Sequence, residues 1–289
     1  MLYKSAQDFL ASENKSIALF GMSGVGKTTI SALLSQQSWF HYSVDYRIGT
    51  RYLNEEISNA LKASAMRDPL LGQLLRQDAI YLGLNITVDN LAPLSSYVGM
   101  LGDSALGGLD YGQFMHRQAL HRKAEIAALL DSAAFKQSAQ QIYGYPHFIC
   151  DTGGSLIEVI ELDDRNDPVT LCLTQHCLPV YIEADAGLLE QIISRGLKEP
   201  KPMYYNPNFI ENAVKKYLEQ HGLKRIEQAA PRDFAAWVLA ELLHDRAPRY
   251  RRFAQQHGCI ISAKKAAELK SEQDLLAAIA QAIDEAAAR

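Results

Sequence analysis

The fold is decided by residues 21–28, which read Gly21-Met22-Ser23-Gly24-Val25-Gly26-Lys27-Thr28. This stretch matches the phosphate-binding pattern G-x-x-x-x-G-K-[ST] at every fixed position. The apolar run 17–20 before it predicts a short buried strand, and residues 28–34 after it predict a helix. Glycines let backbone N–H groups turn toward phosphate oxygens, and the positive end of the helix dipole favours an anion at the same place. We therefore expect a phosphate group to bind between this strand and this helix.

The side chains of the loop have separate expected roles. Lys27 is expected to reach the β- and γ-phosphates of a nucleotide, and the Thr28 hydroxyl to bind Mg²⁺. ATP and Mg²⁺ are accordingly the expected cofactors. The expected nucleotide-binding residues of the loop and the first helical turn are Gly21, Ser23, Gly24, Val25, Gly26, Lys27, Thr28 and Thr29.

The composition is that of an ordinary globular protein. The chain has 289 residues, of which 48% are hydrophobic and 21% charged, with a net charge of −4. No apolar stretch approaches the roughly 18 residues that a membrane helix needs, and the first residues lack the apolar core of a secretion signal. Four cysteines without a C-x-x-C pair predict reduced thiols and a cytoplasmic location. The acidic balance argues against a dedicated nucleic-acid surface.

Strand-like and helix-like segments alternate along the chain, which predicts an α/β fold with a doubly wound parallel sheet of about five strands. The expected strands are 17–20, 40–44, 147–150, 179–183 and 259–262. Helices are expected at 6–10, 54–65, 113–142, 187–195, 208–220, 232–243 and 271–288, with another beginning at Asp167-Pro168. We interpret residues 1–289 as a single domain. Its core is 1–50 and 145–289, and 51–144 form a helical insertion or lid.

Two aspartates follow expected strands. Asp45 follows the second strand and Asp151 the third. Ligands of an open parallel sheet collect beyond the carboxyl ends of its strands, where a carboxylate can bind Mg²⁺ or orient and deprotonate an acceptor hydroxyl. Both are therefore expected to be catalytic, with Lys27, and Asp151 is expected to bind metal with Thr28. The alternative is a turn or helix-capping role, to which aspartate is also suited.

Two glycines and two arginines are candidates for binding the substrate that accepts the phosphate, and each pair has an alternative role. Gly153 and Gly154 follow Asp151 and either let the backbone approach a substrate or form a tight turn. Arg47 and Arg51 either bind an anionic substrate or begin a solvated helix. With Asp45, these four residues are the expected substrate contacts.

The order of these motifs resembles the P-loop kinases of the shikimate-kinase-like and nucleotide-kinase-like group. The resemblance covers roughly residues 15–50 and 145–289. Besides the phosphate loop it rests on Val44-Asp45-Tyr46-Arg47, Asp151-Thr152-Gly153-Gly154-Ser155, Lys201-Pro202-Met203-Tyr204 and Arg246-Ala247-Pro248-Arg249-Tyr250. It implies that Arg195 and Lys201 are catalytic lid cations and that Arg246 lies near the adenine of ATP.

The chain also departs from that family. Shikimate kinases carry two aspartates, two residues apart, on the second strand. Asp45 matches the second, and Ser43 stands at the position of the first, so either Ser43 or Asp151 would complete the Mg²⁺ site. Lys201 replaces an arginine and lacks its bidentate fork. The insertion replaces the small segment that binds shikimate in that family, so a different acceptor is expected.

Three functions follow from this reading. The leading one is a Mg·ATP-dependent kinase of a small hydroxylated or phosphorylated metabolite. The second is an ATPase or nucleotide switch that acts on a partner protein and uses the insertion as a docking surface. The third is a transferase acting on RNA, because Asp45-Tyr46-Arg47-Ile48-Gly49-Thr50 is faintly similar to the P-loop tRNA prenyltransferases. The acidic balance weighs against the third.

Overall fold

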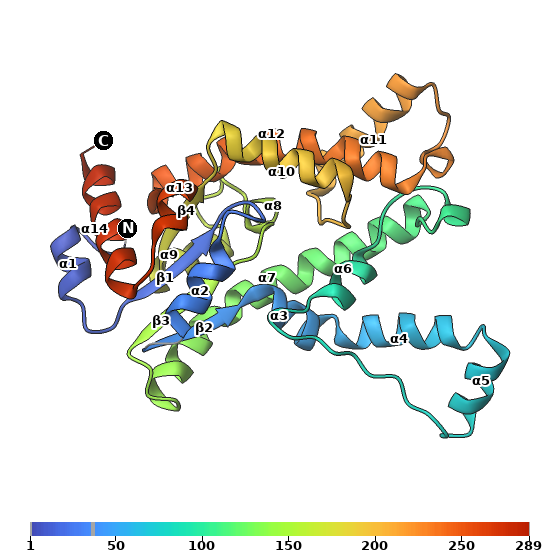
Figure 1. Ribbon diagram of the computed structural model, residues 1–289, viewed down its shortest axis with the longest axis horizontal. Helices are drawn as coiled ribbons and strands as arrows, with labels where there is room; N and C mark the ends of the chain where they lie inside the picture. Colours follow the sequence, from blue (N-terminus) through green and yellow to red (C-terminus); the bar gives the residue numbers. More distant parts are fainter. Residues whose placement is uncertain (1, 36–37, 289) are drawn as a thin grey trace.

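A sheet of five parallel strands lies at the centre of the structure, a computed structural model that describes residues 2–35 and 38–288. The strand order is β2-β3-β1-β4-β5. The strands are β1 (Ser16–Phe20), β2 (Trp39–Ser43), β3 (His147–Asp151), β4 (Leu178–Glu183) and β5 (Cys259–Ser262). The expected α/β fold with a parallel sheet of about five strands is confirmed (Figure 1).

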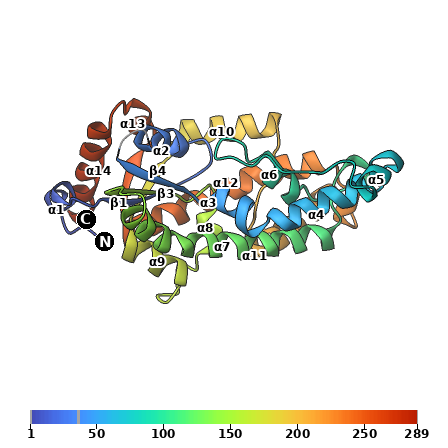
Figure 2. The same ribbon diagram turned by 90° about the horizontal axis from the view of Figure 1, so that it is seen from below.

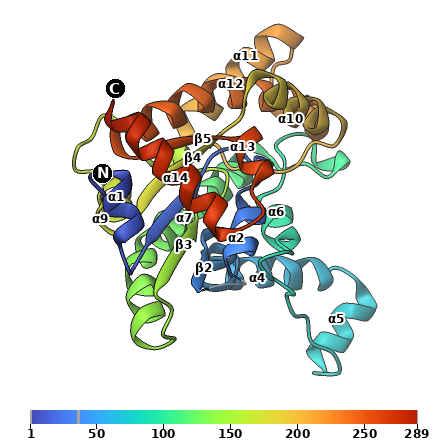
Figure 3. The ribbon, with the colours of Figure 1, turned by 60° about the vertical axis from the view of Figure 1, so that its left-hand side comes forward.

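Helices cover both faces of the sheet. Those before the middle of the chain are α1 (Ala6–Ala11), α2 (Lys27–Ser35), α3 (Val44–Arg47), α4 (Asn54–Ala65), α5 (Pro69–Arg76), α6 (Ala92–Val98) and α7 (Tyr111–Gln141). Those after it are α8 (Leu156–Val159), α9 (Pro168–His176), α10 (Ala186–Lys198), α11 (Pro207–His221), α12 (Pro231–His257), α13 (Ala263–Glu268) and α14 (Glu272–Ala287). Helices α7, α9 and α12 lie on one side of the sheet, and α2, α13 and α14 on the other (Figures 2 and 3).

This double cover explains the composition of the strands. Every residue of β1 is buried, and Ile17 pairs in register with Ile149 of β3 and Leu178 of β4. A strand with neighbours on both edges and helices on both faces has no side open to water, so it is apolar along its length rather than alternating. The short apolar runs in the sequence therefore predicted the strands closely, with β5 beginning and ending at the expected residues.

Two boundaries near the site differ from the sequence prediction. The second strand ends at Ser43, and Asp45 lies in the first turn of α3 rather than at a strand end, because the Ser43 hydroxyl accepts a hydrogen bond from Tyr46 N and caps this helix. The helix expected at 232–243 continues to His257 as α12. Helix α12 runs through Pro248, whose lost hydrogen bond is offset by bonds that Arg246 and Tyr250 make to the turn after β3.

The segment 51–144 is largely helical, as expected, and includes two helices that the pattern did not predict, α5 and α6. It begins in a π-helical turn, η1 (Ile48–Tyr52), and also holds the 3₁₀ turn η2 (Ser104–Leu106). Helices α4 and α5 project away from the sheet (Figure 1). The first part of α7 instead packs with α11, the first part of α12 and the 3₁₀ turn η3 (Ile226–Gln228) around a second apolar core that includes Phe114, Tyr217 and Phe234.

Two further expectations concern the chain as a whole. Over the described residues, no helix combines the length and the apolar character that crossing a membrane requires. All four cysteines are unpaired thiols, as the spacing predicted.

Candidate functional site

The phosphate loop has the backbone that its glycines predicted. Residues 21–26 turn sharply between β1 and α2, with φ of 138° at Gly21 and 98° at Gly26. Side chains disfavour these values, and a β-carbon at Gly21 would lie 2.6 Å from the Ile182 carbonyl oxygen. The loop can therefore follow this path beside β4 only because glycine occupies the position.

Lys27 begins α2 and turns back into the loop. Its side chain is buried, and Nζ donates to the carbonyl oxygens of Gly21 at 2.9 Å and Met22 at 3.0 Å. Burial lowers the pKa of Lys27, while the nearby carboxyls of Asp151 and Asp45 act in the opposite direction. An ammonium group held inside a glycine loop is suited to bind an anion, which relieves the cost of burying its charge.

Thr28, in the first turn of α2, meets Asp151 at the end of β3. The Thr28 hydroxyl donates to Asp151 Oδ2 at 3.3 Å, and Asp151 Oδ1 accepts from Gly153 N at 3.2 Å. Mg²⁺ commonly takes one or two protein oxygens and completes its shell with water and phosphate oxygens. This hydroxyl–carboxylate pair fits that requirement. Among the described residues, no group of three or more His, Cys, Asp or Glu side chains is arranged to hold a metal. A site at Thr28 would therefore depend on phosphate oxygens.

Asp45 faces the same place from α3. A β-carbon at Gly153 would lie 2.6 Å from Asp45 Oδ1, so the carboxylate rests against the backbone of the turn after β3. Burial raises the pKa of Asp45 to about 6; the charge of Asp151 adds to this shift and that of Lys27 opposes it. A carboxylate with a pKa near neutrality is suited to accept a proton at physiological pH.

The sheet topology explains why these groups converge. The connection after β1 leads past β3 to β2, whereas the connection after β3 leads past β1 to β4. Adjacent strands whose connections leave in opposite directions open a crevice at their carboxyl ends, the usual ligand site of open α/β sheets. The phosphate loop follows β1 and Asp151 ends β3, so both lie at this switch point.

A cavity of about 630 Å³ opens beside this crevice. Its walls come from the phosphate loop, α10, residues 199–204 and α12. The residues expected from sequence that line it are Ser23, Gly24, Asp45, Gly154, Arg195, Lys201 and Arg246. Arg195 Nη2 lies 3.7 Å from where a β-carbon on Gly24 would stand, so this guanidinium reaches over the phosphate loop. The structure thus brings the loop, one of the two candidate aspartates and both lid candidates to one space.

Two expected substrate residues lie elsewhere. Arg47 pairs with Asp131 of α7 at 2.9 Å, and its guanidinium lies 4.9 Å from the centre of the Phe135 ring. Arg51 is exposed on η1. Neither lines the cavity. The pairing of Arg47 ties α3 to α7, so its position matches a structural role more closely than contact with a ligand in this cavity.

Arg246 is almost fully buried and its guanidinium is engaged by the protein. Nε donates to Glu158 Oε1 at 3.0 Å, Nη1 to the Gly154 carbonyl at 2.9 Å and Nη2 to the Tyr204 carbonyl at 2.8 Å. It thereby joins α12 to the glycine turn and to the segment before α11. Its expected place near adenine stays a prediction, and its contacts here fix the shape of the cavity.

Sequence reasoning missed several polar residues of this region. Glu125 of α7 and Glu158 of α8 are both fully buried, and Glu125 accepts a hydrogen bond from Ser155, which lines the cavity. Glu125 lies within a helical pattern beside Ile126 and Leu129, where a glutamate ordinarily faces water. The only signal was its i,i+4 spacing from His121, which lies 3.5 Å away.

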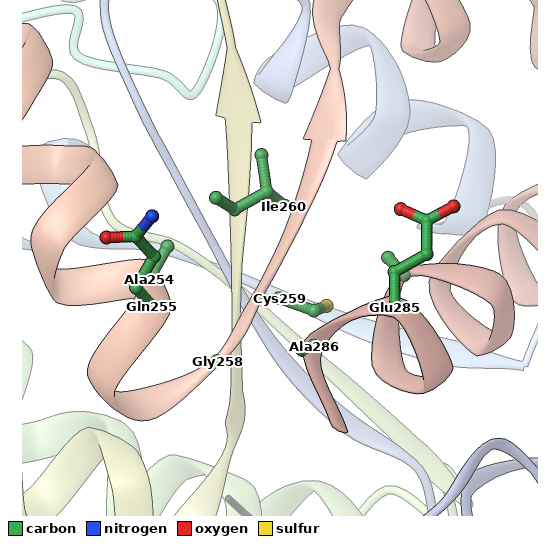
Figure 4. A pocket seen from close by; sticks show the side chains of 8 residues that line it. Ala254, Gln255, Gly258, Cys259, Ile260, Glu285 and Ala286 are labelled. Carbon is green, nitrogen blue, oxygen red and sulfur yellow. The ribbon is translucent and has the colours of Figure 1, made fainter. Parts of the chain in front are cut away.

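A smaller cavity, of about 190 Å³, lies far from these groups (Figure 4). It is formed between the ends of α12 and α14, beside Gly258 and Cys259 at the start of β5, and Gln255 and Glu285 stand at its sides. Because the strands are parallel, this is the amino end of the sheet, opposite to the phosphate loop.

Comparison with known proteins gives no relative: no family model matches the chain, and no curated protein or solved structure is significantly similar to it.

Proposed function

We propose that the chain is a P-loop phosphotransferase, a Mg·ATP-dependent kinase of a small hydroxylated or phosphorylated acceptor. The observation that carries this proposal is the meeting of the phosphate loop, Asp45 and the cations Arg195 and Lys201 around one cavity. Separate nucleotide and acceptor sites are what a kinase requires. A cavity with carboxylate, hydroxyl and apolar walls offers the second beside the first.

The donor half is the loop at 21–28. Its N–H groups and the start of α2 would hold the phosphates, and the Lys27 ammonium would leave the Gly21 and Met22 carbonyls to bind them. Thr28 and Asp151 would hold Mg²⁺, which neutralises phosphate charge when bound. Arg195 and Lys201 would stabilise the charge that develops on the transferred group.

The acceptor half is the cavity. Asp45 would accept the proton of an acceptor hydroxyl, and its raised pKa keeps it basic enough to do so. In the same cavity, Met203, Leu239 and Leu243 provide apolar walls that would fit the carbon skeleton of a metabolite. The exposed cations Arg195, Lys198 and Lys201 favour an acceptor with an anionic group.

The test is ATP consumption in the presence of fractionated metabolite pools. The unmodified chain should transfer the γ-phosphate to one fraction, and Lys27→Ala and Asp45→Asn should each lower that transfer at least about 100-fold. Lys264→Ala and Asp89→Asn change exposed residues outside the cavity and should leave it unchanged. Full phosphotransfer by Asp45→Asn would remove the assigned role of this residue.

One observation favours the second candidate function, a nucleotide switch that binds a partner protein. The projecting helices α4 and α5 and the segment after them carry large apolar side chains in water, among them Leu70 at 64% and Tyr81 at 91% exposure. Such side chains often belong to protein interfaces. ATP hydrolysis that needs no small acceptor and stops on removal of Leu70 and Tyr81 would support this alternative.

A further inference from the structure

The proposed chemistry uses neither Glu125 nor Glu158, two buried carboxyls of this region, and Glu158 is paired with arginines. Glu125 comes from the middle of α7 and is fully buried. Its Oε1 accepts a hydrogen bond of 2.8 Å from the hydroxyl of Ser155, the residue that follows the glycine turn. Ser155 lines the cavity together with Asp45. Glu125 therefore contacts a residue of the cavity wall without lining the cavity itself.

The charges around the turn leave Glu125 without a cation. Glu158 pairs with Arg246 at 3.0 Å and with Arg249 at 3.3 Å. Asp45 and Asp151 share the positive field of Lys27. Within residues 2–35 and 38–288, no lysine or arginine lies within ion-pair distance of Glu125, whose only such neighbour is His121 Nδ1 at 3.5 Å. An isolated ionised carboxylate in this position would be costly.

The neighbours of Glu125 favour its neutral form. Burial raises the pKa of Glu125 to about 8; Asp45 and Glu158 add to this shift, while the Ser155 hydrogen bond and Arg246 oppose it. Burial lowers the pKa of His121 to about 4, so its imidazole is neutral near pH 7. The Tyr204 ring stacks on this imidazole with the ring centres 4.9 Å apart.

A neutral carboxyl satisfies both sides of this cluster. Oε1 accepts from Ser155. Glu125 Oε2 and His121 Nδ1 lie 3.5 Å apart and are buried without a hydrogen-bond partner, so a proton on Oε2 would serve both atoms. Since the Ser155 hydroxyl donates to Glu125, its oxygen lone pairs are left to face the cavity. There they can accept a hydrogen bond from the group that attacks the phosphate.

We propose that Glu125 is a positioning residue that acts as a neutral carboxyl, holding the Ser155 oxygen as a hydrogen-bond acceptor for the attacking hydroxyl or water beside Asp45. This rests on the proposed phosphotransferase function. Glutamine has the same shape as a neutral glutamate and an N–H in place of its O–H. Glu125→Gln should therefore preserve activity, whereas Glu125→Ala should not.

The experiment uses hydrolysis of Mg·ATP by the full chain, with water in place of the unidentified acceptor, from pH 5 to 9. The unmodified chain should lose activity above about pH 8, because ionised Glu125 adds a negative charge near Asp45. Glu125→Gln should keep its activity at pH 7 within about threefold and lose the alkaline decline. Glu125→Ala and Ser155→Ala should lower activity about tenfold or more at all pH values. Glu219→Gln changes an exposed glutamate on α11 and should match the unmodified chain.

Urea unfolding over the same pH range gives a readout that needs no activity. The unmodified chain should lose stability relative to Glu125→Gln as pH rises from about 4.5 to 8, because the folded state holds a proton that the unfolded state releases. If this difference is present but neither hydrolysis nor phosphotransfer to any metabolite fraction is detected, the kinase proposal fails while the neutral carboxyl stands. Equal loss of activity in Glu125→Gln and Glu125→Ala, or no pH-dependent difference in unfolding, overturns the inference.

Discussion

The carboxylate of Asp45 rests against the α-carbon of Gly153, so closely that a β-carbon there would stand 2.6 Å from Oδ1. The two residues belong to α3 and to the turn after β3, more than 100 positions apart. The next residue, Gly154, lies close to the phosphate loop, since a β-carbon on it would stand 3.3 Å from Ser23 N. The glycine turn therefore sets the distance between Asp45 and the phosphate loop.

This contact predicts that Gly153→Ala lowers the free energy of unfolding by more than the strain of its positive φ alone would. Gly153 has φ of 75°, and Gly144 has φ of 72° with no atom within 4 Å of the added methyl group. Gly144→Ala should cost about 1 kcal/mol from backbone strain alone. Gly153→Ala should cost about 1–3 kcal/mol more, since Asp45 must move, and should lower Mg·ATP turnover. Urea unfolding of both variants measures the difference, and equal costs would show that the Asp45 contact relaxes freely.

Asp45→Asn is expected to stabilise the fold while it removes activity. The pKa of Asp45 is raised from 3.8 to about 6 in the folded state, so between these values the folded chain holds a proton that the unfolded chain has released. The free energy of unfolding contributed by this group therefore falls as pH rises through that window, by up to about 3 kcal/mol. Asparagine at this position does not titrate, so the free energy of unfolding no longer falls over this pH range. The variant should be more stable than the unmodified chain at pH 7 and equal to it near pH 4. A lower melting temperature than the unmodified chain at pH 7 would contradict this sign.

The strand, glycine loop and helix at residues 16–35 could be predicted from the sequence because their pattern is local. Residues 21–28 are contiguous, and the preceding strand and following helix are encoded beside them. Asp151 followed in the same way from its place after an apolar run. The long-range pairs could not be predicted, since nothing in the sequence places Glu125 against Ser155 or Arg47 against Asp131. Arg246 was singled out by its motif, but its contacts depend on α12 continuing through Pro248.

Arg246→Met should destabilise the fold by about 3–5 kcal/mol. The change removes three hydrogen bonds and leaves Glu158 paired with the more distant Arg249 and bonded to Asn206 N. Arg251→Met is the matched control, because Arg251 is 58% exposed in its side chain and pairs with Glu183 near the surface. Its loss should cost less than about 1 kcal/mol. Chemical denaturation compares the two, and similar costs would mean that water or another side chain replaces the buried guanidinium.

Arg195→Ala should weaken the use of Mg·ATP and leave stability almost unchanged. Arg195 is exposed on α10, yet its Nη2 lies near the phosphate loop, 3.7 Å from the β-carbon position of Gly24. If Arg195 binds phosphate as proposed, its removal should raise KM for Mg·ATP or lower kcat about tenfold. Arg232→Ala removes an exposed arginine outside the cavity and should change neither value nor the melting temperature. Because screening by salt weakens contacts between exposed charges, the ratio of unmodified to Arg195→Ala activity should also shrink as ionic strength rises. A ratio that stays constant with salt would place Arg195 outside the phosphate site.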